Sequence, residues 1–474
     1  MKGVVKMLNI SVEEYIEKSN IFECSLDTKY KKDNGVFYTH LELSSLILQE
    51  LLIKDDAIIL DPCCGSGSFI YSALSNGCLN VYGADIDGKA VNFCKKHLGL
   101  KTLKKIDTLG LSGASVLKKM GLKNKVDYVV GNPPYCPMDK EITIDTEEYH
   151  FLRNVKDSGS NLFVAALYRA FELAKDDGII AYIIPKNFLH VRSYSRLRRY
   201  ILSSKTIVSI IDIGAYFPSV RGEQIILILK NSFNADNVVA IKRFIDDTFV
   251  ECSEVRQDFY KDEILLFKSS EEFTIYSKLE NTYEKFSDIC NGYIGRGKSI
   301  SSDAITGKEI RKFGFKNHKV PAKGNRVFIQ NIYSAEAGII ASFAGNELEA
   351  TQTVTVFTDG DEKMCRYILG ILHSRLCNFY LLKFCYNASK LTMHTDAKYL
   401  SRLPLIRKDN VMFDQVVNLV KALETREYMS SIWFEMLESL NGLIYKIFGI
   451  SDNEIAYIDR EMMAIQSKRW KNDK

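Results

Sequence analysis

The first half of the chain alternates short apolar runs with stretches in which apolar residues recur every three or four positions. Runs of β-branched and aromatic residues predict strands, and the longer period predicts helices. The predicted strands cover residues 57–60, 81–84, 126–130, 179–184, 207–213 and 224–229. The predicted helices cover residues 10–32, 41–52 and 161–174, and a short one ends at Leu74. Strands that alternate with helices favour an α/β fold around a mostly parallel sheet.

Beyond residue 235 the pattern is mixed. Strands are predicted at residues 239–249 and 325–332, and helices at residues 366–386, 412–426 and 429–448. Gly370 is expected to interrupt the first of these helices, because glycine weakens a helix interior. We therefore predict three parts, which are an N-terminal helical segment at residues 1–34, an α/β domain at 35–235 and a mixed α+β domain at 236–474.

Composition limits the size and the location of the protein. With 474 residues the chain is long enough for two or three domains. Its 46% hydrophobic and 26% charged residues are typical of soluble globular proteins. No apolar run approaches the ~20 residues that span a bilayer. Because Glu13, Glu14 and Glu17 precede any long apolar run, a signal peptide is not expected. These features predict a cytoplasmic protein without a membrane partner.

The cysteines and histidines argue against a metal site. The 11 cysteines form no C-x-x-C pair, and the 7 histidines do not cluster near them. An odd number of cysteines favours reduced thiols in a cytosol. We therefore expect no bound metal.

The charge is small overall but unevenly distributed. The net charge is +4, yet residues 185–205 contain six Lys or Arg and no acidic residue, and residues 296–326 contain nine basic residues against two acidic ones. Two such runs favour a polyanionic partner, although a solvated basic face is the alternative for either. The candidate DNA-binding residues are Lys186, Arg192, Arg196, Arg296, Lys298, Arg311, Lys312, Lys316 and Arg326.

The segment that follows the predicted strand at 126–130 is the strongest candidate for chemistry. It reads Asn132-Pro133-Pro134-Tyr135. The two prolines lack N–H donors and hold the chain extended, so this turn is stiff. It would present the Asn132 side chain and the Pro133 carbonyl as adjacent acceptors beside the Tyr135 ring, which suits an amino group on a flat ring. The alternative is a proline-rich turn in which Asn132 bonds its own backbone.

A glycine-containing loop follows the predicted strand at 57–60. It reads D-P-C-C-G-S-G-S-F at residues 61–69, and Gly65 and Gly67 permit a tight turn with close backbone approach to a ligand. The loop matches neither the dinucleotide fingerprint nor a P-loop. Asp85, at the end of the second predicted strand, is suited to accept hydrogen bonds from ribose hydroxyls.

Two further positions could contribute to a ligand site. Thr39 and Glu42 have the spacing of a capping box, so Thr39 is predicted to open the helix at 41–52, whose first N–H groups would suit a carboxylate. Asp107 follows Ile106 at a predicted third strand end and could accept from an adenine amino group. An ordinary loop acid is the alternative for Asp107.

Taken in order, these segments resemble a known family. F-Y-T at residues 37–39, D-P-C-C-G-S-G at 61–67 and N-P-P-Y at 132–135 precede a long C-terminal region. In this order they resemble the gamma-class N6-adenine DNA methyltransferases of bacterial restriction–modification systems. The resemblance implies a Rossmann-like seven-stranded methyltransferase core, S-adenosylmethionine as cofactor and a C-terminal DNA-recognition domain. It further implies methyl transfer to the N6 amino group of a flipped adenine.

The resemblance also implies partners and residue roles. The partners would be double-stranded DNA and a separate cognate restriction endonuclease, with the chain itself acting as a monomer. The implied catalytic residues are Asn132, Pro133, Pro134 and Tyr135, and Tyr135 and Phe217 would stack on the target base. The implied cofactor-binding residues are Tyr38, Thr39, Asp61, Cys63, Gly65, Gly67, Asp85, Ile86, Asp107, Asn132 and Pro134. One departure is His40, which stands where the family usually has proline.

Other functions share parts of this pattern. N4-cytosine or RNA-base methylation would use the same acceptors, and a non-catalytic nucleic-acid-binding subunit could keep the same fold. Cytosine-5 methylation needs a cysteine nucleophile, for which Cys63, Cys64 and Cys136 are available, but it has no use for paired acceptors aimed at an amino group. A Rossmann oxidoreductase is disfavoured because the third glycine of its fingerprint is missing.

Overall fold

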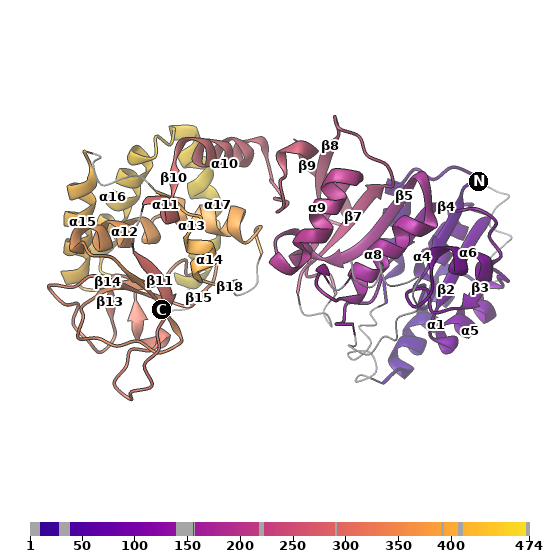
Figure 1. Cartoon of the computed structure of the whole chain (residues 1–474), viewed down its shortest axis with the longest axis horizontal. Helices are drawn as coiled ribbons and strands as arrows, with labels where there is room; N and C mark the ends of the chain where they lie inside the picture. The colour runs from indigo at the N-terminus through magenta and orange to yellow at the C-terminus, as the bar shows by residue number, and fades with distance from the viewer. Residues whose placement is uncertain are drawn as a thin grey trace. The chain divides into compact units, whose positions relative to one another are not determined.

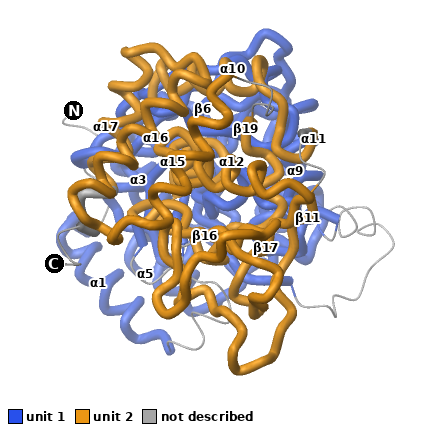
Figure 2. Tube along the Cα trace, turned by 90° about the vertical axis from the view of Figure 1, so that its left-hand side faces the viewer, with its two compact units in different colours: residues 1–268 blue, residues 269–474 orange. Residues whose placement is uncertain are grey.

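Two compact units make up the chain, Met1–Lys268 and Ser269–Lys474, here named unit 1 and unit 2 (Figure 2). The structure is a computed structural model that describes residues 10–27, 38–138, 155, 157–217, 222–289, 292–389, 393–405 and 411–470. Each unit has its own hydrophobic core. Along the described ranges, every helix falls short of the length and apolar character needed to cross a bilayer.

Unit 1 is built on a nine-stranded sheet in the order β3-β2-β1-β4-β5-β7-β6-β8-β9 (Figure 1). The strands are β1 (Ile58–Asp61), β2 (Asn80–Asp85), β3 (Leu103–Lys105), β4 (Val126–Gly131), β5 (Ala174–Pro185), β6 (Thr206–Gly214), β7 (Gln224–Lys230), β8 (Val238–Ile245) and β9 (Thr248–Arg256). Strands β1 to β5 pair in parallel, and β7 runs antiparallel between β5 and β6. The strands β1 to β7 confirm the predicted seven-stranded Rossmann-like core.

The sheet continues past the domain boundary predicted near residue 235. Strand β8 pairs in parallel with β6, and β9 pairs antiparallel with β8. The turn between them places Asp246 and Asp247 at φ 46° and 58°, where short polar side chains are tolerated. The strand predicted at 239–249 is therefore two arms of a hairpin. Unit 1 extends to Lys268 and keeps this hairpin in the same sheet.

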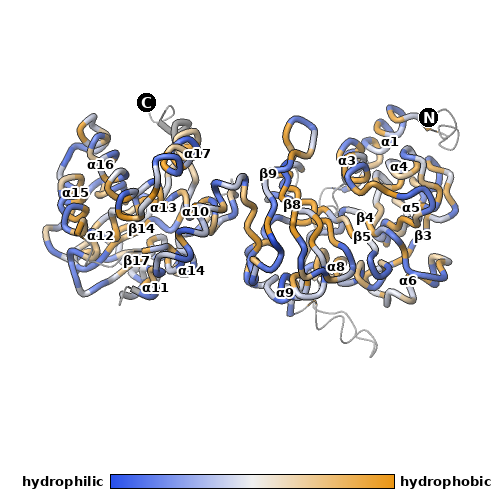
Figure 3. The backbone as a smooth tube through the Cα atoms, turned by 90° about the horizontal axis from the view of Figure 1, so that it is seen from above, coloured by the Kyte–Doolittle hydropathy of each residue, from blue (hydrophilic) through white to orange (hydrophobic). Residues whose placement is uncertain are grey.

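Helices cover the sheet because its central strands are apolar on both faces. Every residue from Ile180 to Ile184 in β5 is at most 1% exposed, which requires cover on both sides. The strands of this sheet appear largely in the hydrophobic colour in Figure 3. The described helices of unit 1 are α1 (Val12–Ser25), α3 (Leu41–Glu50), α4 (Ser68–Ser75), α5 (Gly88–Leu98), α6 (Gly113–Met120), α8 (Leu162–Leu173) and α9 (Ser195–Ser204).

Helix α1 is shorter than the predicted helix at 10–32 and packs on the core of unit 1. The Ser11 side chain caps its N-terminus. The Tyr15 ring stacks on the Tyr71 ring of α4 with centroids 4.3 Å apart, and the Tyr15 hydroxyl donates to the Ser66 carbonyl at 2.9 Å. The N-terminal helix therefore supports the loop between β1 and α4.

Unit 2 has the predicted mixed α+β character. Its four-stranded antiparallel sheet has the order β11 (Tyr293–Arg296), β17 (Val354–Thr358), β14 (Arg326–Gln330), β16 (Ala341–Ala344). Short strand pairs are β10 (Glu284–Lys285) with β19 (Pro404–Leu405), β12 (Ile310–Arg311) with β13 (Gly314–Phe315), and β15 (Ile332–Tyr333) with β18 (Met393–His394). The described helices are α10 (Ser270–Thr282), α11 (Phe286–Ile289), α12 (Glu362–His373), α13 (Arg375–Tyr380), a π-helix (Leu381–Cys385), α14 (Ala397–Leu400), α15 (Phe413–Thr425), α16 (Ser431–Ile447) and α17 (Asp452–Trp470).

The long apolar helix predicted at 366–386 is broken, but not at Gly370. Gly370 lies inside α12, and a Cβ there would come within 2.8 Å of Val416 Cγ1 on α15. The chain instead breaks at Ser374, whose hydroxyl accepts from the Cys377 N–H at 3.1 Å and caps α13. The prediction was wrong because Gly370 allows α12 and α15 to pack closely, and helix propensity does not describe packing between helices.

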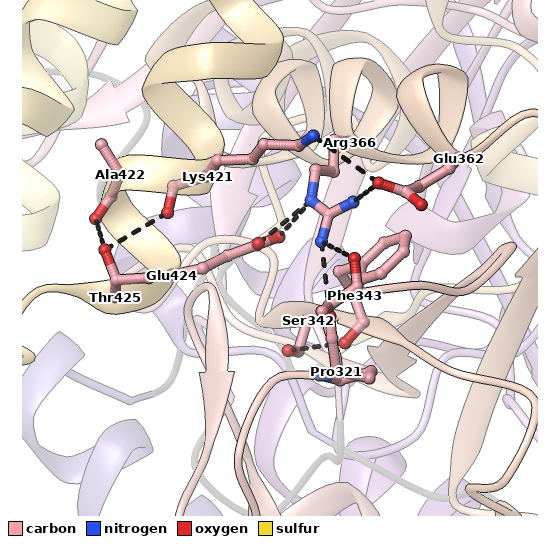
Figure 4. Close-up of polar contacts among 10 residues, drawn as sticks. Pro321, Ser342, Phe343, Glu362, Arg366, Lys421, Ala422, Glu424 and Thr425 are labelled. Carbon is pink, nitrogen blue, oxygen red and sulfur yellow. Dashed lines mark hydrogen bonds and ion pairs between the residues drawn. The ribbon is translucent and has the colours of Figure 1, made fainter.

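A buried arginine joins the helices of unit 2 to its sheet (Figure 4). Arg366 Nε donates to both carboxylate oxygens of Glu424, at 3.2 and 3.0 Å, and Nη1 donates to Glu362 at 2.5 Å. Its guanidinium lies 3.7 Å from the centroid of the Phe343 ring of β16, and Nη2 points to the Pro321 carbonyl at 3.4 Å. Burial raises the pKa of Glu424 to about 7, although Arg366 opposes that rise.

Candidate active site

The loop between β1 and α4 forms one wall of the candidate site. Gly65 has φ +52°, and a Cβ there would come within 2.7 Å of Tyr38 Cε1. Gly67, at φ +91°, caps α4, and a Cβ there would lie 2.9 Å from Cys94 Sγ. Both positions need glycine, for backbone conformation and for space. The structure thus brings Tyr38 against the predicted glycine loop.

Asp85 holds this loop in place. One carboxylate oxygen accepts from the Gly65 N–H and the other from the Asp87 N–H, both at 2.8 Å. Burial raises the pKa of Asp85, while the two backbone donors oppose that rise. The next residue, Ile86, is 63% exposed at the carboxyl edge of β2. Asp85 therefore lies at the predicted site, with a loop-positioning role that the sequence did not suggest.

Asp61 is a buried carboxylate at the carboxyl end of β1. It is 1% exposed, and its Oδ1 accepts from the Cys63 N–H at 3.0 Å. A Cβ on Gly131, the last residue of β4, would lie 2.8 Å from the same oxygen. Burial raises the pKa of Asp61 well above its ordinary value, and Asp85 adds to the rise. Among the residues that the structure describes, Asp61 has no ion-pair partner.

Thr39 lies beside the glycine loop but does not open α3. The N-cap of α3 is His40, which makes no side-chain cap bond, so the predicted capping box is wrong. The Thr39 carbonyl instead accepts from the Ser68 hydroxyl at 2.6 Å, at the start of α4. The first turns of α3 and α4 are thereby held together.

The N-P-P-Y segment directly follows β4, the strand that pairs in parallel with β1. The Tyr135 hydroxyl donates to Asn132 Oδ1 and also lies 3.0 Å from the Ile183 carbonyl of β5. One hydroxyl proton can serve only one of these two acceptors at a time. Burial raises the pKa of Tyr135 well above its ordinary value, so this hydroxyl stays protonated. The structure brings Asn132 and Tyr135 into direct contact.

Phe217, predicted to stack on the target base, has a buried ring. It is 3% exposed and belongs to the hydrophobic core of unit 1. Its ring meets the Tyr216 ring edge-on, with centroids 5.1 Å apart, and lies 6.5 Å from the His40 ring. The adjoining residues 218–221, part of the loop considered in the sequence, lie outside the described residues. Stacking by Phe217 remains a prediction.

Asp107 follows β3 and is exposed. Its Oδ1 accepts from the Leu109 N–H at 3.2 Å and the Gly110 N–H at 2.9 Å, as an ordinary loop acid does. The neighbouring Thr108 was not predicted as a site residue. Its buried hydroxyl donates to the Pro62 carbonyl at 2.8 Å and ties the end of β3 to the glycine loop. In the sequence, only its position next to Asp107 could have indicated that Thr108 contributes to the site.

Lys186, a candidate DNA-binding residue, is buried, whereas a contact with DNA needs an exposed side chain. Lys186 is 3% exposed, and its Nζ lies 2.8 Å from Asp212 and 3.6 Å from Glu223. Burial acts to raise the pKa of Asp212, but Lys186 outweighs it and the pKa is lowered. A buried lysine must be paired, so its position between carboxylates explains it. From the same run, Arg192 is exposed, and Arg196 is exposed and paired with Asp157.

The basic run of unit 2 is more accessible. Lys298 and Lys316 are exposed, and Arg296 is exposed and paired with Asp396 at 2.9 Å. The remaining candidates are partly buried, namely Arg311, Lys312 and Arg326. Arg311 lies over the Tyr428 ring at 5.2 Å, and Arg326 over the Phe328 ring at 5.5 Å. Within the described part of the chain, no cluster of three metal-ligating side chains occurs.

Comparison with known proteins identifies the family. A family model described as N-6 DNA Methylase matches residues 19–290, more than half of the chain. The chain belongs to the N-6 DNA methylase family. The chain is 28% identical over 213 residues to the type II methyltransferase M.VspI of Vibrio sp. (strain 343), covering 42% of the chain and 48% of M.VspI. It is 27% identical over 199 residues to the modification methylase CviBIII of Paramecium bursaria Chlorella virus NC1A, covering 41% and 49%.

The chain thus matches about half the length of each of these relatives. A likeness that covers more of the chain comes from a solved structure, the Type IIL restriction-modification enzyme MmeI in complex with DNA. The chain aligns with it at a TM-score of 0.59 and 11% identity, over 95% of this chain and 82% of MmeI. That likeness concerns the fold, and it includes residues of both units.

Proposed function

We propose that the protein transfers a methyl group from S-adenosylmethionine to the N6 amino group of adenine in duplex DNA. The observation that carries the proposal is the Asn132-Pro133-Pro134-Tyr135 segment at the end of β4, directly after the glycine that adjoins Asp61. Family membership and the names of M.VspI and CviBIII support it. We propose further that the chain is the modification enzyme of a restriction–modification system with a separate endonuclease.

The residues around the glycine loop fit S-adenosylmethionine. The buried Asp61 carboxylate suits the ammonium group of the methionine part, because a buried charge needs a partner. Gly65 keeps the loop backbone open to a ligand, and Asp85 can hold that loop and still accept from a ribose hydroxyl, since each carboxylate oxygen has more than one lone pair. The exposed Ile86 suits the adenine ring. Further proposed contacts are Tyr38, Thr39, Cys63, Asp107 and Pro134. When bound, the cofactor supplies an electrophilic methyl group.

The chain's own residues act on the amino group of the target base. Its lone pair is delocalised into the ring, and two acceptors, Asn132 Oδ1 and the Pro133 carbonyl, would draw it toward tetrahedral geometry. Asn132 Oδ1 can accept from the amino group while it also accepts from the Tyr135 hydroxyl, because an amide oxygen has two lone pairs. The Ile183 carbonyl at 3.0 Å offers the hydroxyl another acceptor. Positioning and electrostatics then lower the barrier without a covalent intermediate.

The target adenine must leave the helix to reach this site. Extrusion costs a few kcal/mol, and stacking on an aromatic ring returns about 1–3 kcal/mol. Tyr135 is the first partner for such stacking. Phe217 could join it only if its buried ring became exposed, because it is 3% exposed.

Unit 2 is proposed to recognise the DNA sequence. The proposal is supported by the exposed basic residues of the 296–326 run and by the fold likeness to MmeI, whose structure includes DNA. Lysines and arginines on loops can reach phosphates and base edges. A chain that carries its own recognition domain is expected to act as a monomer.

The test is methylation of DNA by the protein and by Asn132→Ala. Loss of one acceptor should cost about 3 kcal/mol of barrier, or about 100-fold in turnover with cofactor and DNA saturating. Asn92→Ala, at an exposed position of α5, is a matched control that should keep full turnover. Near-normal turnover of Asn132→Ala would refute the mechanism.

Mass spectrometry of the digested DNA decides the base. N6-methyladenine is the expected product. N4-methylcytosine would replace the base assignment while keeping the same acceptors. No methylated base from the wild-type protein would favour a non-catalytic nucleic-acid-binding subunit.

A further inference from the structure

Tyr182 is a buried tyrosine whose hydroxyl has no hydrogen-bond partner in the described part of the chain. It lies in β5 among aliphatic residues and is 1% exposed. A buried hydroxyl without a partner costs the fold free energy, so it calls for an explanation. In the sequence, Tyr182 is one apolar position of the strand predicted at 179–184.

The position of Tyr182 connects it to the cofactor site. In the parallel pairing of β4 and β5 it lies opposite Gly131, the residue before Asn132. Gly131 in turn adjoins Asp61 Oδ1. Burial raises the pKa of Tyr182 well above its ordinary value, and the acidic groups of Cys63 and Asp61 add to the rise. The strand pairing therefore places Tyr182 one strand away from the Asp61 carboxylate, with Gly131 between them.

The chemistry of these neighbours identifies the kind of ligand group that would satisfy the hydroxyl. Asp61 is a buried carboxylate without a cation partner among the described residues. The phenol oxygen of Tyr182, whose strand position pairs with Gly131, is a further acceptor. A carboxylate and a neutral oxygen close together suit a compact cation with several N–H donors, which describes a primary ammonium group.

We propose that Tyr182 is a further cofactor-binding residue, whose hydroxyl accepts a hydrogen bond from the ammonium group of the methionine part of S-adenosylmethionine, beside Asp61. This inference rests on the cofactor named in the proposed function. It predicts that the hydroxyl does not support the fold by itself and acts only when the amino-acid part of the ligand is present.

Tyr182→Phe tests this role because it removes the hydroxyl and keeps the ring. The variant should unfold at the same temperature as the wild type or higher when no ligand is added, since a hydroxyl without a partner has been deleted. It should bind S-adenosylhomocysteine about 10- to 100-fold more weakly, the range for a hydrogen bond to a charged group. The control is Ser209→Ala, which removes another buried hydroxyl without a partner, on β6, and should leave binding unchanged.

Two smaller ligands locate the interaction by titration calorimetry on the full chain. 5′-Methylthioadenosine lacks the amino-acid part, so wild type and Tyr182→Phe should bind it equally. The analogue of S-adenosylhomocysteine that lacks only the carboxylate keeps the ammonium group, so it should show the full loss in Tyr182→Phe.

The possible outcomes are distinct. Equal binding of S-adenosylhomocysteine by wild type and Tyr182→Phe overturns the inference and leaves the proposed function standing. An equal loss with 5′-methylthioadenosine also overturns it, because the damage would then extend to the whole pocket. If Tyr182→Phe and wild type bind the decarboxylated analogue equally, the Tyr182 hydroxyl contacts the carboxylate of the ligand, and the ammonium contact is overturned. Failure of the wild type to bind any of the three ligands overturns the proposed function itself, and the inference with it.

Discussion

Replacing Arg366 with methionine should strongly destabilise unit 2. The arginine side chain is 3% exposed and the Glu424 side chain 5% exposed, so removal of the guanidinium leaves a buried carboxylate without its cation. Breaking a buried ion pair in this way costs about 3–5 kcal/mol. Methionine retains much of the packing against Phe343, so the loss should reflect mainly the charge and the hydrogen bonds.

The size of the effect should depend on pH. Burial raises the pKa of Glu424 from an ordinary value of 4.5 to about 7, so the folded protein holds this proton more tightly than the unfolded chain. The stability that Glu424 contributes is therefore fully present below about pH 4.5 and is lost as the pH rises through 7. The gap corresponds to about 3 kcal/mol. Without Arg366 the pKa rises further, because only Arg366 and Lys421 oppose burial. The variant should thus lose about 3–5 kcal/mol at pH 8 but less at pH 5, where Glu424 is protonated.

Tryptophan fluorescence during urea unfolding measures this in the full chain. Both tryptophans of the chain, Trp433 and Trp470, belong to unit 2, and Trp433 is 1% exposed, so its emission should change on unfolding. Arg296→Met is the matched control, because its ion pair with Asp396 is 51% and 37% exposed and should contribute less than about 1 kcal/mol. A loss below about 1 kcal/mol for Arg366→Met at pH 8, or an equal loss at pH 5 and pH 8, would refute this reasoning.

Two further predictions concern DNA binding and the domain boundary. Replacing the exposed Lys316, Lys319 and Lys323 with alanine should weaken the salt dependence of DNA binding, so that the slope of log K for binding against log salt becomes shallower by up to about 3 in fluorescence anisotropy. Turnover at saturating DNA should not fall. An unchanged slope would exclude phosphate contacts by these lysines. A fragment of residues 1–268 should stay monomeric in size-exclusion chromatography, bind S-adenosylhomocysteine and show no preference for a DNA sequence. A fragment of residues 1–235 should aggregate, because removal of β8 exposes the edge of β6. Equal behaviour of the two fragments would contradict the role given to the hairpin of β8 and β9.

The amino-acid sequence by itself determined the elements of unit 1 and their order. Strand β7 and residues 179–184 of β5 are nearly continuous apolar runs, because both of their faces are buried, and such runs can be recognised without knowledge of the fold. Gly65 and Gly67 and the two prolines after Asn132 restrict the backbone directly. The candidate site could therefore be located from these local constraints.

The partners of individual side chains were decided by the tertiary structure alone. Lys186 belongs to a basic run, but it pairs with Asp212 of β6 and with Glu223, just before β7, and is buried between them. Phe217 follows a strand as a loop residue would, yet its ring is part of the core.

Tyr182 illustrates the same limit most clearly. Within its own strand it is one apolar position among others, and only the pairing with β4 places it opposite Gly131, which adjoins Asp61 at the end of β1. Local sequence sets backbone preference and the period of burial, because these depend on residues a few positions apart. Whether a charge is paired or a hydroxyl satisfied depends on residues from distant segments, and these meet only when the sheet has formed.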